Sequence, residues 1–223
     1  MQPPLLVASL KADKMEGHLI SSDPHNALVT TMTSTARLIS RAIGRLDQDI
    51  LLLDATSAHW RTGNTAFRNS RILRMRLKCT RGLRWVTLKV FRNGTLHITG
   101  HYGVDICCFV LEKLCEALNA LYDDKTVHTY CWLMGDTLLT NYRMTLGRRI
   151  SLTSLASLAV TNDFRVHLDP RDTSVNIKWE VDNGAWGSIR VFATGNVIVS
   201  LPRVSLRART AAFVTLLNFL QSV

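Results

Sequence analysis

The chain has 223 residues, of which 47% are apolar and 20% are charged, and its formal net charge is +10. No run approaches the roughly 20 apolar residues of a membrane-spanning helix, so no such helix is expected. The five cysteines include no Cys-x-x-Cys pair. We therefore predict no metal site and no cofactor, and thiols that pack among apolar side chains in a reducing compartment.

Residues 1–24 are predicted to be a flexible leader that ends at a turn-like Ser-Ser-Asp-Pro sequence. The leader lacks a basic region and a cleavage site, so no secretory signal is expected. Residues 25–123 form the first predicted half of the protein, and their apolar periodicity indicates both strands and helices. The strands are expected at 26–33, 72–79, 84–91 and 96–99, and the helices at 37–46 and 104–121.

Residues 124–223 repeat this order of elements as a second half. Strands are expected at 129–134, 138–143, 174–181, 188–192 and 197–200, and helices at 152–158 and 204–220. Each half then consists of a strand, a helix, several antiparallel strands and a long helix. We predict an α+β fold in which the two halves form one curved antiparallel sheet, with helices on one face and the other face bare.

One strand–turn–strand pattern occurs twice, in residues 86–100 and 187–201. Each copy contains an alternating strand, a Phe, a two-residue spacer, a Gly and a second alternating strand. Phe91 and Phe192 lie 101 residues apart, as do Gly94 and Gly195. The Gly suits a tight turn, because it adopts positive φ without steric strain. The two copies indicate a duplicated half-domain.

Side chains alternate between the two faces of a strand, so each hairpin has two rows of residues. The predicted core rows are aliphatic: Val86, Leu88, Val90, Leu96 and Ile98, and Ile189, Val191, Val197 and Val199. The opposite rows are Thr87, Lys89, Phe91, Thr95, His97 and Thr99, and Ser188, Arg190, Phe192, Asn196, Ile198 and Ser200. A Phe beside a turn often packs under a loop. Its repetition two residues after a cation instead favours an apolar wedge that separates base steps of DNA.

Basic residues are concentrated in one segment. Between Arg68 and Arg92 there are nine Lys and Arg and no Asp or Glu. This imbalance favours a polyanionic partner, with nucleic acid first and an anionic membrane second. A solvated basic surface without a partner is the alternative.

The duplicated hairpin resembles a motif of the TATA-box-binding protein (TBP) family. Residues 90–94 with 98–100 (Val-Phe-Arg-Asn-Gly and Ile-Thr-Gly) resemble the family's Ile-Phe-x-x-Gly-Lys-x-x-x-Thr-Gly hairpin, and so do residues 191–195 with 199–200. Residues 25–29 (His-Asn-Ala-Leu-Val) resemble its Gln-Asn-Ile-Val-Ser opening strand.

The second repeat carries further resemblance to this family. Residues 133–135 (Leu-Met-Gly) resemble its Met-Val-Gly, and residues 146–150 (Leu-Gly-Arg-Arg-Ile) resemble the stretch that leads into its short helix. The likeness covers nearly all of the chain after residue 24. Identity outside the hairpins is low, as expected of a remote member, such as one encoded by a large DNA virus.

The resemblance implies a saddle whose concave sheet binds a widened minor groove, with phenylalanines wedged between base steps. Phe91 and Phe192 match one wedge of each repeat, and Thr99 and Ser200 match paired hydroxyls that reach base edges. Asn26 matches a base-reading Asn. The expected DNA-binding residues are Asn26, Leu28, Lys89, Phe91, His97, Thr99, Trp132, Met134, Arg190, Phe192, Ile198 and Ser200.

Several positions depart from the family pattern. Trp132 stands at the second repeat's Asn position, with Met134 as its apolar neighbour and Asp136 on the same face. His97, Lys89 and Arg190 replace aliphatic residues. The second wedge of each repeat has no clear match, and the alternatives are Ser70 or Phe67 and Ser174 or Trp179. These departures affect TATA specificity more than DNA bending.

No nucleotide-binding loop, nucleophile elbow or zinc-protease motif is present, so no enzyme is expected. The resemblance implies a transcription initiation factor that binds and bends duplex DNA at promoters. Its expected partners are duplex DNA, general initiation factors and RNA polymerase, with no membrane partner, and the chain is expected to be a monomer or homodimer. The expected location is the nucleus, or a cytoplasmic virus factory if the chain is viral.

A function of a different class stays open at this point. The chain could be a TBP-like protein-interaction module that has lost specific DNA readout. Trp132, Met134 and Phe192 would then hold a protein ligand or a second chain.

Overall fold

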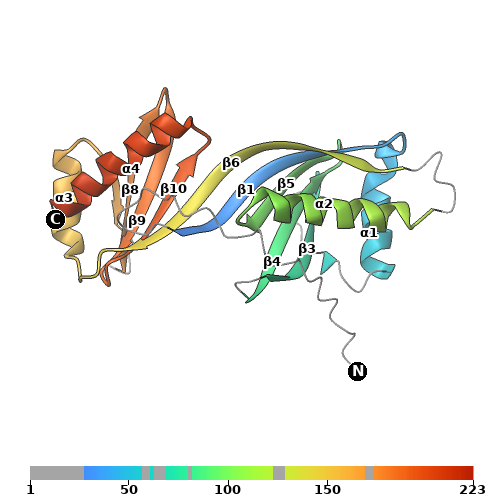
Figure 1. Cartoon of the computed structure of the whole chain (residues 1–223), viewed down its shortest axis with the longest axis horizontal. Helices are drawn as coiled ribbons and strands as arrows, with labels where there is room; N and C mark the ends of the chain where they lie inside the picture. The colour runs from blue at the N-terminus through green and yellow to red at the C-terminus, as the bar shows by residue number, and fades with distance from the viewer. Residues whose placement is uncertain are drawn as a thin grey trace. The chain divides into compact units, whose positions relative to one another are not determined.

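The computed structural model describes residues 28–56, 61–62, 69–79, 82–122, 129–168 and 173–222. The elements up to α2 are β1 (Leu28–Ile39), the 3₁₀ helix η2 (Ile43–Arg45), α1 (Leu46–Thr56), β2 (Arg61–Thr62), β3 (Ser70–Cys79), β4 (Gly82–Phe91), β5 (Thr95–His101) and α2 (Val104–Asn119) (Figure 1). The later elements are β6 (Cys131–Thr145), α3 (Leu152–Thr161), β7 (Arg165–Leu168), β8 (Ser174–Asp182), β9 (Ala185–Phe192), β10 (Asn196–Pro202) and α4 (Leu206–Gln221).

The described chain divides into two compact units. Unit 1 contains residues 31–137, and unit 2 contains residues 28–30 and 138–222, so β1 and β6 contribute to both. The predicted leader, residues 1–24, lies outside the described residues, as does the predicted junction between the halves within 123–128. The predicted repeats, 25–123 and 124–223, therefore stay a prediction.

The sheet of unit 1 has the strand order β2-β3-β4-β5-β1-β6, with antiparallel pairing from β2 to β1. Its core row is as predicted, because the five aliphatic residues of the β4–β5 hairpin are at most 2% exposed. Helix α2 presents a buried stripe that includes Val110, Leu114 and Leu118, at the spacing of an amphipathic helix. Contacts of α2 with β5 place the helix over this core row.

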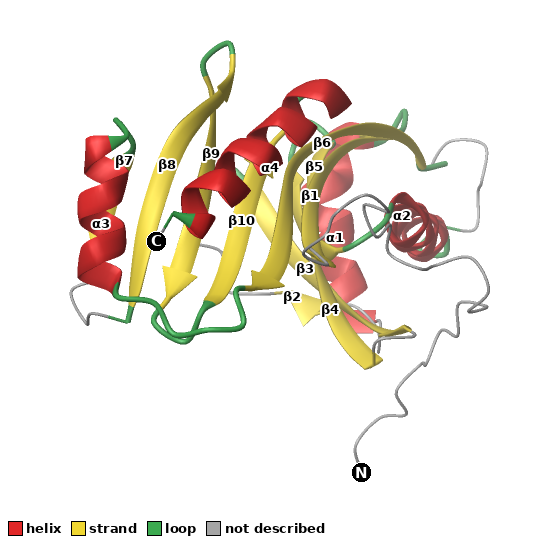
Figure 2. Ribbon diagram, turned by 60° about the vertical axis from the view of Figure 1, so that its left-hand side comes forward, coloured by secondary structure: helices red, strands yellow, loops and turns green. Residues whose placement is uncertain are grey.

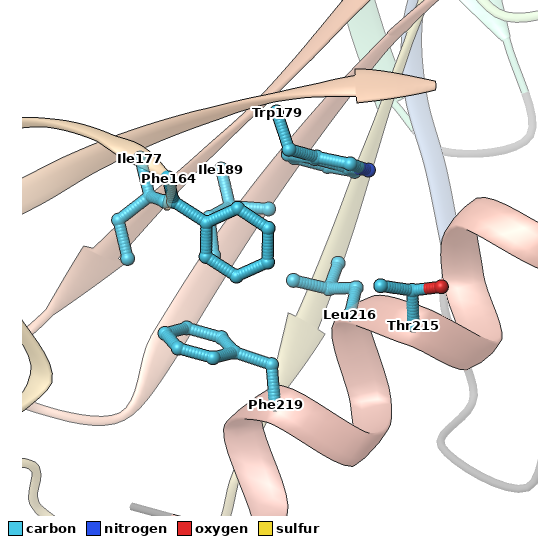
Figure 3. A pocket seen from close by; sticks show the side chains of 7 residues that line it. All are labelled: Phe164, Ile177, Trp179, Ile189, Thr215, Leu216 and Phe219. Carbon is cyan, nitrogen blue, oxygen red and sulfur yellow. The ribbon is translucent and has the colours of Figure 1, made fainter. Parts of the chain in front are cut away.

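The sheet of unit 2 has the order β1-β6-β10-β9-β8-β7. Helix α4 covers its core row, and Figure 2 shows this helix lying across the strands. Phe213 of α4 meets the Tyr142 ring edge-on at 4.9 Å between centroids, and Phe219 meets Phe164 at 5.0 Å. Figure 3 shows the small pocket that remains under α4, which is lined by Phe164, Ile177, Trp179, Ile189, Thr215, Leu216 and Phe219.

Each unit thus has a helix-covered face and a second face that no described helix covers. We call the second one the open face. In unit 1 it carries Arg37, Arg74, Arg76, Lys78, Trp85, Thr87, Lys89, Phe91, His97 and Thr99, and in unit 2 it carries Asn141, Arg143, Lys178, Trp186, Ser188, Arg190, Phe192, Ile198 and Ser200. None of the described helices is long and apolar enough to cross a membrane.

The two duplicated glycines close equivalent turns. Gly94 and Gly195 have φ of +83° and +82°, and their N–H groups donate to the carbonyls of Phe91 and Phe192 at 2.9 and 2.8 Å. A Cβ on Gly94 would lie 2.6 Å from the Leu38 carbonyl oxygen. Any side chain at these two positions would therefore strain the backbone and collide with it.

The helix predicted at residues 37–46 is wrong. β1 continues to Ile39, and α1 begins at Leu46. Ala36 and Leu38 are 3% and 1% exposed, whereas Arg37 and Ile39 are exposed. Burial that alternates with a period of two is typical of a strand. The helix was predicted because apolar residues four positions apart fit the period of a strand and that of a helix equally well. The strands predicted at 129–134 and 138–143 form the single strand β6, and the edge strand β7 was not predicted.

His101 makes the stability of unit 1 depend on pH. The side chain is fully buried at the end of β5, and its Nδ1 lies 3.1 Å from the Gly103 carbonyl oxygen. Burial lowers the pKa of His101 below its usual 6.5. The unfolded chain therefore binds the proton more tightly, and stability present above pH 6.5 is lost as the pH falls.

We expect the free energy of unfolding to fall between pH 7 and pH 5, by up to about 1.4 kcal/mol per pH unit. His101→Asn should remove this part of the dependence, whereas His167→Asn on the exposed edge of β7 should leave it unchanged. Urea titrations at several pH values measure both slopes. Equal slopes in the wild type and the His101 variant would contradict the assignment.

Candidate nucleic-acid interface

Phe91 lies on the open face of unit 1, between a cation and an imidazole. The Lys89 ammonium is 5.1 Å from the centroid of the Phe91 ring, and the His97 ring meets the same ring edge-on at 5.1 Å. Lys89 and His97 are directly opposite each other in the β4–β5 ladder. Phe91 is half-buried and does not belong to the core under α2. The interaction between the cation and the ring orients both groups toward the open face.

Hydroxyl groups form the next row of this face. Thr99 lies opposite Thr87 on one side and Thr33 on the other. The Thr99 hydroxyl donates to the Thr87 carbonyl at 3.4 Å. The row is half-buried, so its hydroxyl oxygens remain within reach of a ligand on the open face.

Unit 2 repeats this arrangement with different residues. Arg190 is exposed and lies opposite Ile198, which is 37% exposed. Phe192 is half-buried at the end of β9. Ser200 lies opposite Ser188, and its hydroxyl donates to the Asn141 side-chain oxygen at 2.6 Å. Cation, aromatic ring and hydroxyl therefore occupy equivalent positions in the two units.

Asn141 is a site residue that the sequence alone did not reveal. The Leu38 N–H donates to the Gly94 carbonyl at 2.8 Å, and the Leu146 N–H donates to the Gly195 carbonyl at 2.9 Å. These bonds show that β1 and β6 correspond at a separation of 108 residues. Asn141 is then the counterpart of Thr33, beside the hydroxyl row.

The remaining four predicted DNA-binding residues do not belong to the two duplicated hairpins. Asn26 lies outside the described residues, and Leu28 is half-buried at the start of β1. Trp132 and Met134 are half-buried in the part of β6 that belongs to unit 1, whereas the β6 partner of Ser200 is Asn141. Because Asn26 lies outside the described residues, the expected match of Trp132 to the second repeat's Asn position stays a prediction.

The place beside each Phe on the neighbouring strand is occupied by serine. Ser70 lies opposite Phe91, and Ser174 lies opposite Phe192. Both serines are buried, at 4% and 3% exposure. Trp179 points toward α4 (Figure 3) and cannot be a wedge on the open face. Phe67 lies outside the described residues.

Four strands of unit 1 carry cations and no carboxylate on their open face. β1, β3, β4 and β5 contain no Asp or Glu. The open face of these strands carries Arg37, Arg74, Arg76, Lys78 and Lys89.

On the helix side, Arg71 and Arg92 instead pair with Asp47 of α1. The Arg71 hydrogen bond lowers the pKa of Asp47, so this carboxylate stays charged and holds both guanidinium groups. Arg68 and Arg81 of the basic segment lie outside the described residues. The open face of these four strands is thus basic, whereas Arg84 of the same segment lies in the helix-side row opposite Leu77.

Comparison with known proteins identifies the fold. No protein-family model matches the chain, and no curated protein matches it in sequence. Among solved structures, the Methanococcus jannaschii TBP matches with a TM-score of 0.58 and 13% sequence identity. The match covers 87% of this chain and 98% of that chain. The chain therefore has a TBP-like α+β fold, and the predicted fold class is confirmed.

Proposed function

We propose that the chain is a transcription initiation factor that binds and bends duplex DNA at promoters through the open faces of its two units. The observation that carries this proposal is the repeated row of cation, phenylalanine and hydroxyl on each open face. The TBP-like fold supports it, because a duplicated basic sheet surface is suited to a polyanion. The proposed role is binding, without catalysis.

The cations would supply most of the affinity. Lys89 and Arg190 stand at equivalent positions on β4 and β9, where each can contact a phosphate while the neighbouring Phe reaches the bases. Phosphate contacts fix the register of a protein on DNA but do not read its sequence. Sequence preference would then come from the hydroxyl row and from the energy needed to deform the DNA.

The hydroxyl row is suited to the minor groove. Ser200 and Asn141 form a hydrogen-bonded pair at 2.6 Å, and Thr99 and Thr33 occupy the equivalent place in unit 1. Minor-groove edges present acceptors at both A·T and T·A pairs and an added donor at G·C pairs. Short polar groups can distinguish A·T from G·C there, while Phe91 and Phe192 insert at base steps.

The proposed partners follow from this role. Beside duplex DNA they are general initiation factors and RNA polymerase, which would bind away from the open faces. The proposed location is the nucleus, or a cytoplasmic virus factory if the chain is encoded by a virus.

Salt dependence tests the proposal. We expect Lys89→Gln and Arg190→Gln each to reduce the slope of log K against log salt by about 0.9, because each removes one phosphate contact. Sequence preference should change little. Fluorescence anisotropy with duplexes of about 20–30 base pairs, at salt concentrations between about 50 and 200 mM, measures the slopes.

Arg207→Gln is the matched control, because Arg207 is exposed on α4, on the helix-covered side. Its slope should equal that of the wild type. If all three variants keep the wild-type slope, the open faces do not bind DNA, and the protein-interaction function becomes the better explanation.

A further inference from the structure

A second aromatic position is duplicated on the same two strands as the wedge residues. Trp85 and Trp186 lie 101 residues apart, the same separation as Phe91 and Phe192. Each Trp precedes its Phe by six residues. Because this number is even, the Trp lies on the same open face as the Phe, about 20 Å away from it along the strand. Trp85 is 50% exposed and Trp186 is 39% exposed. Large rings with this exposure contribute little to the core.

Each indole has a cation beside it. The Arg76 guanidinium carbon is 5.8 Å from the centroid of the Trp85 ring, and the Arg165 carbon is 4.0 Å from the Trp186 ring. Arg76 lies directly opposite Trp85 in the β3–β4 ladder. A cation near the ring orients the indole, while half of the Trp85 side chain remains open to solvent.

In unit 1 this indole lies beside a line of positive charge. Arg74, Arg76 and Lys78 follow one another on the open face of β3, about 6.6 Å apart at the rise of a strand. Arg74 and Lys78 are exposed. Leu83, which lies opposite Lys78, is 51% exposed and extends the apolar surface around Trp85.

In unit 2 the corresponding row on β8 begins with Lys178 and is then interrupted by a carboxylate, although Arg165 of β7 lies over the Trp186 ring. Glu180 lies opposite Trp186 at the place that corresponds to Arg76, and its carboxylate accepts a hydrogen bond from the Gly184 N–H at 2.6 Å. A carboxylate beside the indole repels a phosphate. The two indoles therefore differ in the charge that surrounds them. Variants of Trp186 can serve as a comparison for variants of Trp85 in the same protein.

We propose that Trp85, with Arg74, Arg76 and Lys78, forms a binding site for single-stranded nucleic acid. One unpaired base stacks on the indole, and the adjoining phosphates contact the three cations. Bases within a duplex are already stacked and offer only their edges, whereas an unpaired base offers its face to an aromatic ring. The site is separate from the wedge residues and does not depend on the proposed duplex binding.

Binding of oligo(dT) and oligo(rU) of about 12 nucleotides, followed by fluorescence anisotropy, tests the site. We expect Trp85→Ala to weaken binding by about 5- to 100-fold, since base–aromatic stacking contributes roughly 1–3 kcal/mol. Trp85→Tyr should retain most of the affinity, because a smaller ring still stacks. Trp186→Ala should weaken binding less than Trp85→Ala does, because Glu180 interrupts the basic row at that position. The two oligonucleotides separate DNA from RNA as the preferred strand.

Phe91→Ala distinguishes this site from the duplex interface, because it should alter duplex bending and leave oligo(dT) affinity nearly unchanged. A melting curve for each variant confirms folding. The proposal is overturned if the wild type does not bind either oligonucleotide, or if Trp85→Ala binds both as tightly as the wild type. Equal losses in the Trp85 and Trp186 alanine variants would also overturn it, since the basic line on β3 would then have no role.

Discussion

We expect replacement of Phe91 or Phe192 with alanine to remove much of the bend in duplex DNA that the proposed interface would induce, while the protein stays folded. Inserted apolar side chains kink duplexes by roughly 20–90° and require a few kcal/mol of unstacking per step. Non-specific affinity should fall much less, because phosphate contacts dominate it. Fluorescence transfer between dyes at the duplex ends measures the bend, and a melting curve measures stability.

Phe109→Ala is a matched control for this prediction. Phe109 is also half-buried and also has a lysine nearby, with the Lys113 ammonium 5.8 Å from its ring centroid, but it lies on α2. The control should bend DNA like the wild type. Burial of a whole ring in a core would make Phe→Ala cost about 3–5 kcal/mol. Unchanged bending with a loss of that size would show that Phe91 and Phe192 are packing residues.

We expect Asp49→Ala to destabilise unit 1 by about 2–5 kcal/mol, because it removes the buried carboxylate to which two tyrosine hydroxyls donate. Asp49 is fully buried in the first turn of α1. The Tyr130 hydroxyl donates to it at 2.6 Å, and the Tyr122 hydroxyl donates to its other oxygen. Tyr130 precedes β6, and its backbone N–H donates to the Asn119 side chain at the end of α2. The carboxylate thus connects α1 with the chain segments on either side of residues 123–128.

Asp47→Asn provides the comparison, because Asp47 stands in the same helical turn but pairs with Arg71 at 27% and 31% side-chain exposure. A pair this exposed to solvent should contribute less than about 1 kcal/mol. Tyr130→Phe, which removes one hydrogen bond to a charged group, should cost about 1.5–3 kcal/mol. Urea denaturation measures all three losses. Similar losses for the Asp47 and Asp49 variants would contradict the role given to the buried carboxylate.

The hairpins could be predicted from the sequence because two local signals agree in them. Aliphatic residues alternate strictly in residues 86–100 and 187–201, and a glycine stands at each turn. The structure buries the expected aliphatic rows and leaves Lys89 and Arg190 on the other face. When a turn fixes where the alternation of a strand begins, that alternation determines which side chains lie on the same face.

The register between distant strands could not be predicted in the same way. Asn141 is recognised as a site residue only through contacts between distant strands, among them its hydrogen bond from Ser200 across the ladder that joins β6 to β10. The sequence contains no local signal for that pairing. Residues 37–46 show the other limit, because Leu38, Ala42 and Leu46 are four residues apart, a spacing that fits both a helical face and a strand alternation.

Photo-crosslinking from defined positions tests most directly whether the open faces bind duplex DNA. A photoreactive side chain would replace Thr87 or Ser188 on the open faces, or Glu112 of α2 or Val214 of α4, both of which are exposed on helices. We expect crosslinks to duplex DNA from Thr87 and Ser188 and none above background from Glu112 and Val214. Crosslinks from the two helix positions, with none from the two strand positions, would contradict the proposed interface.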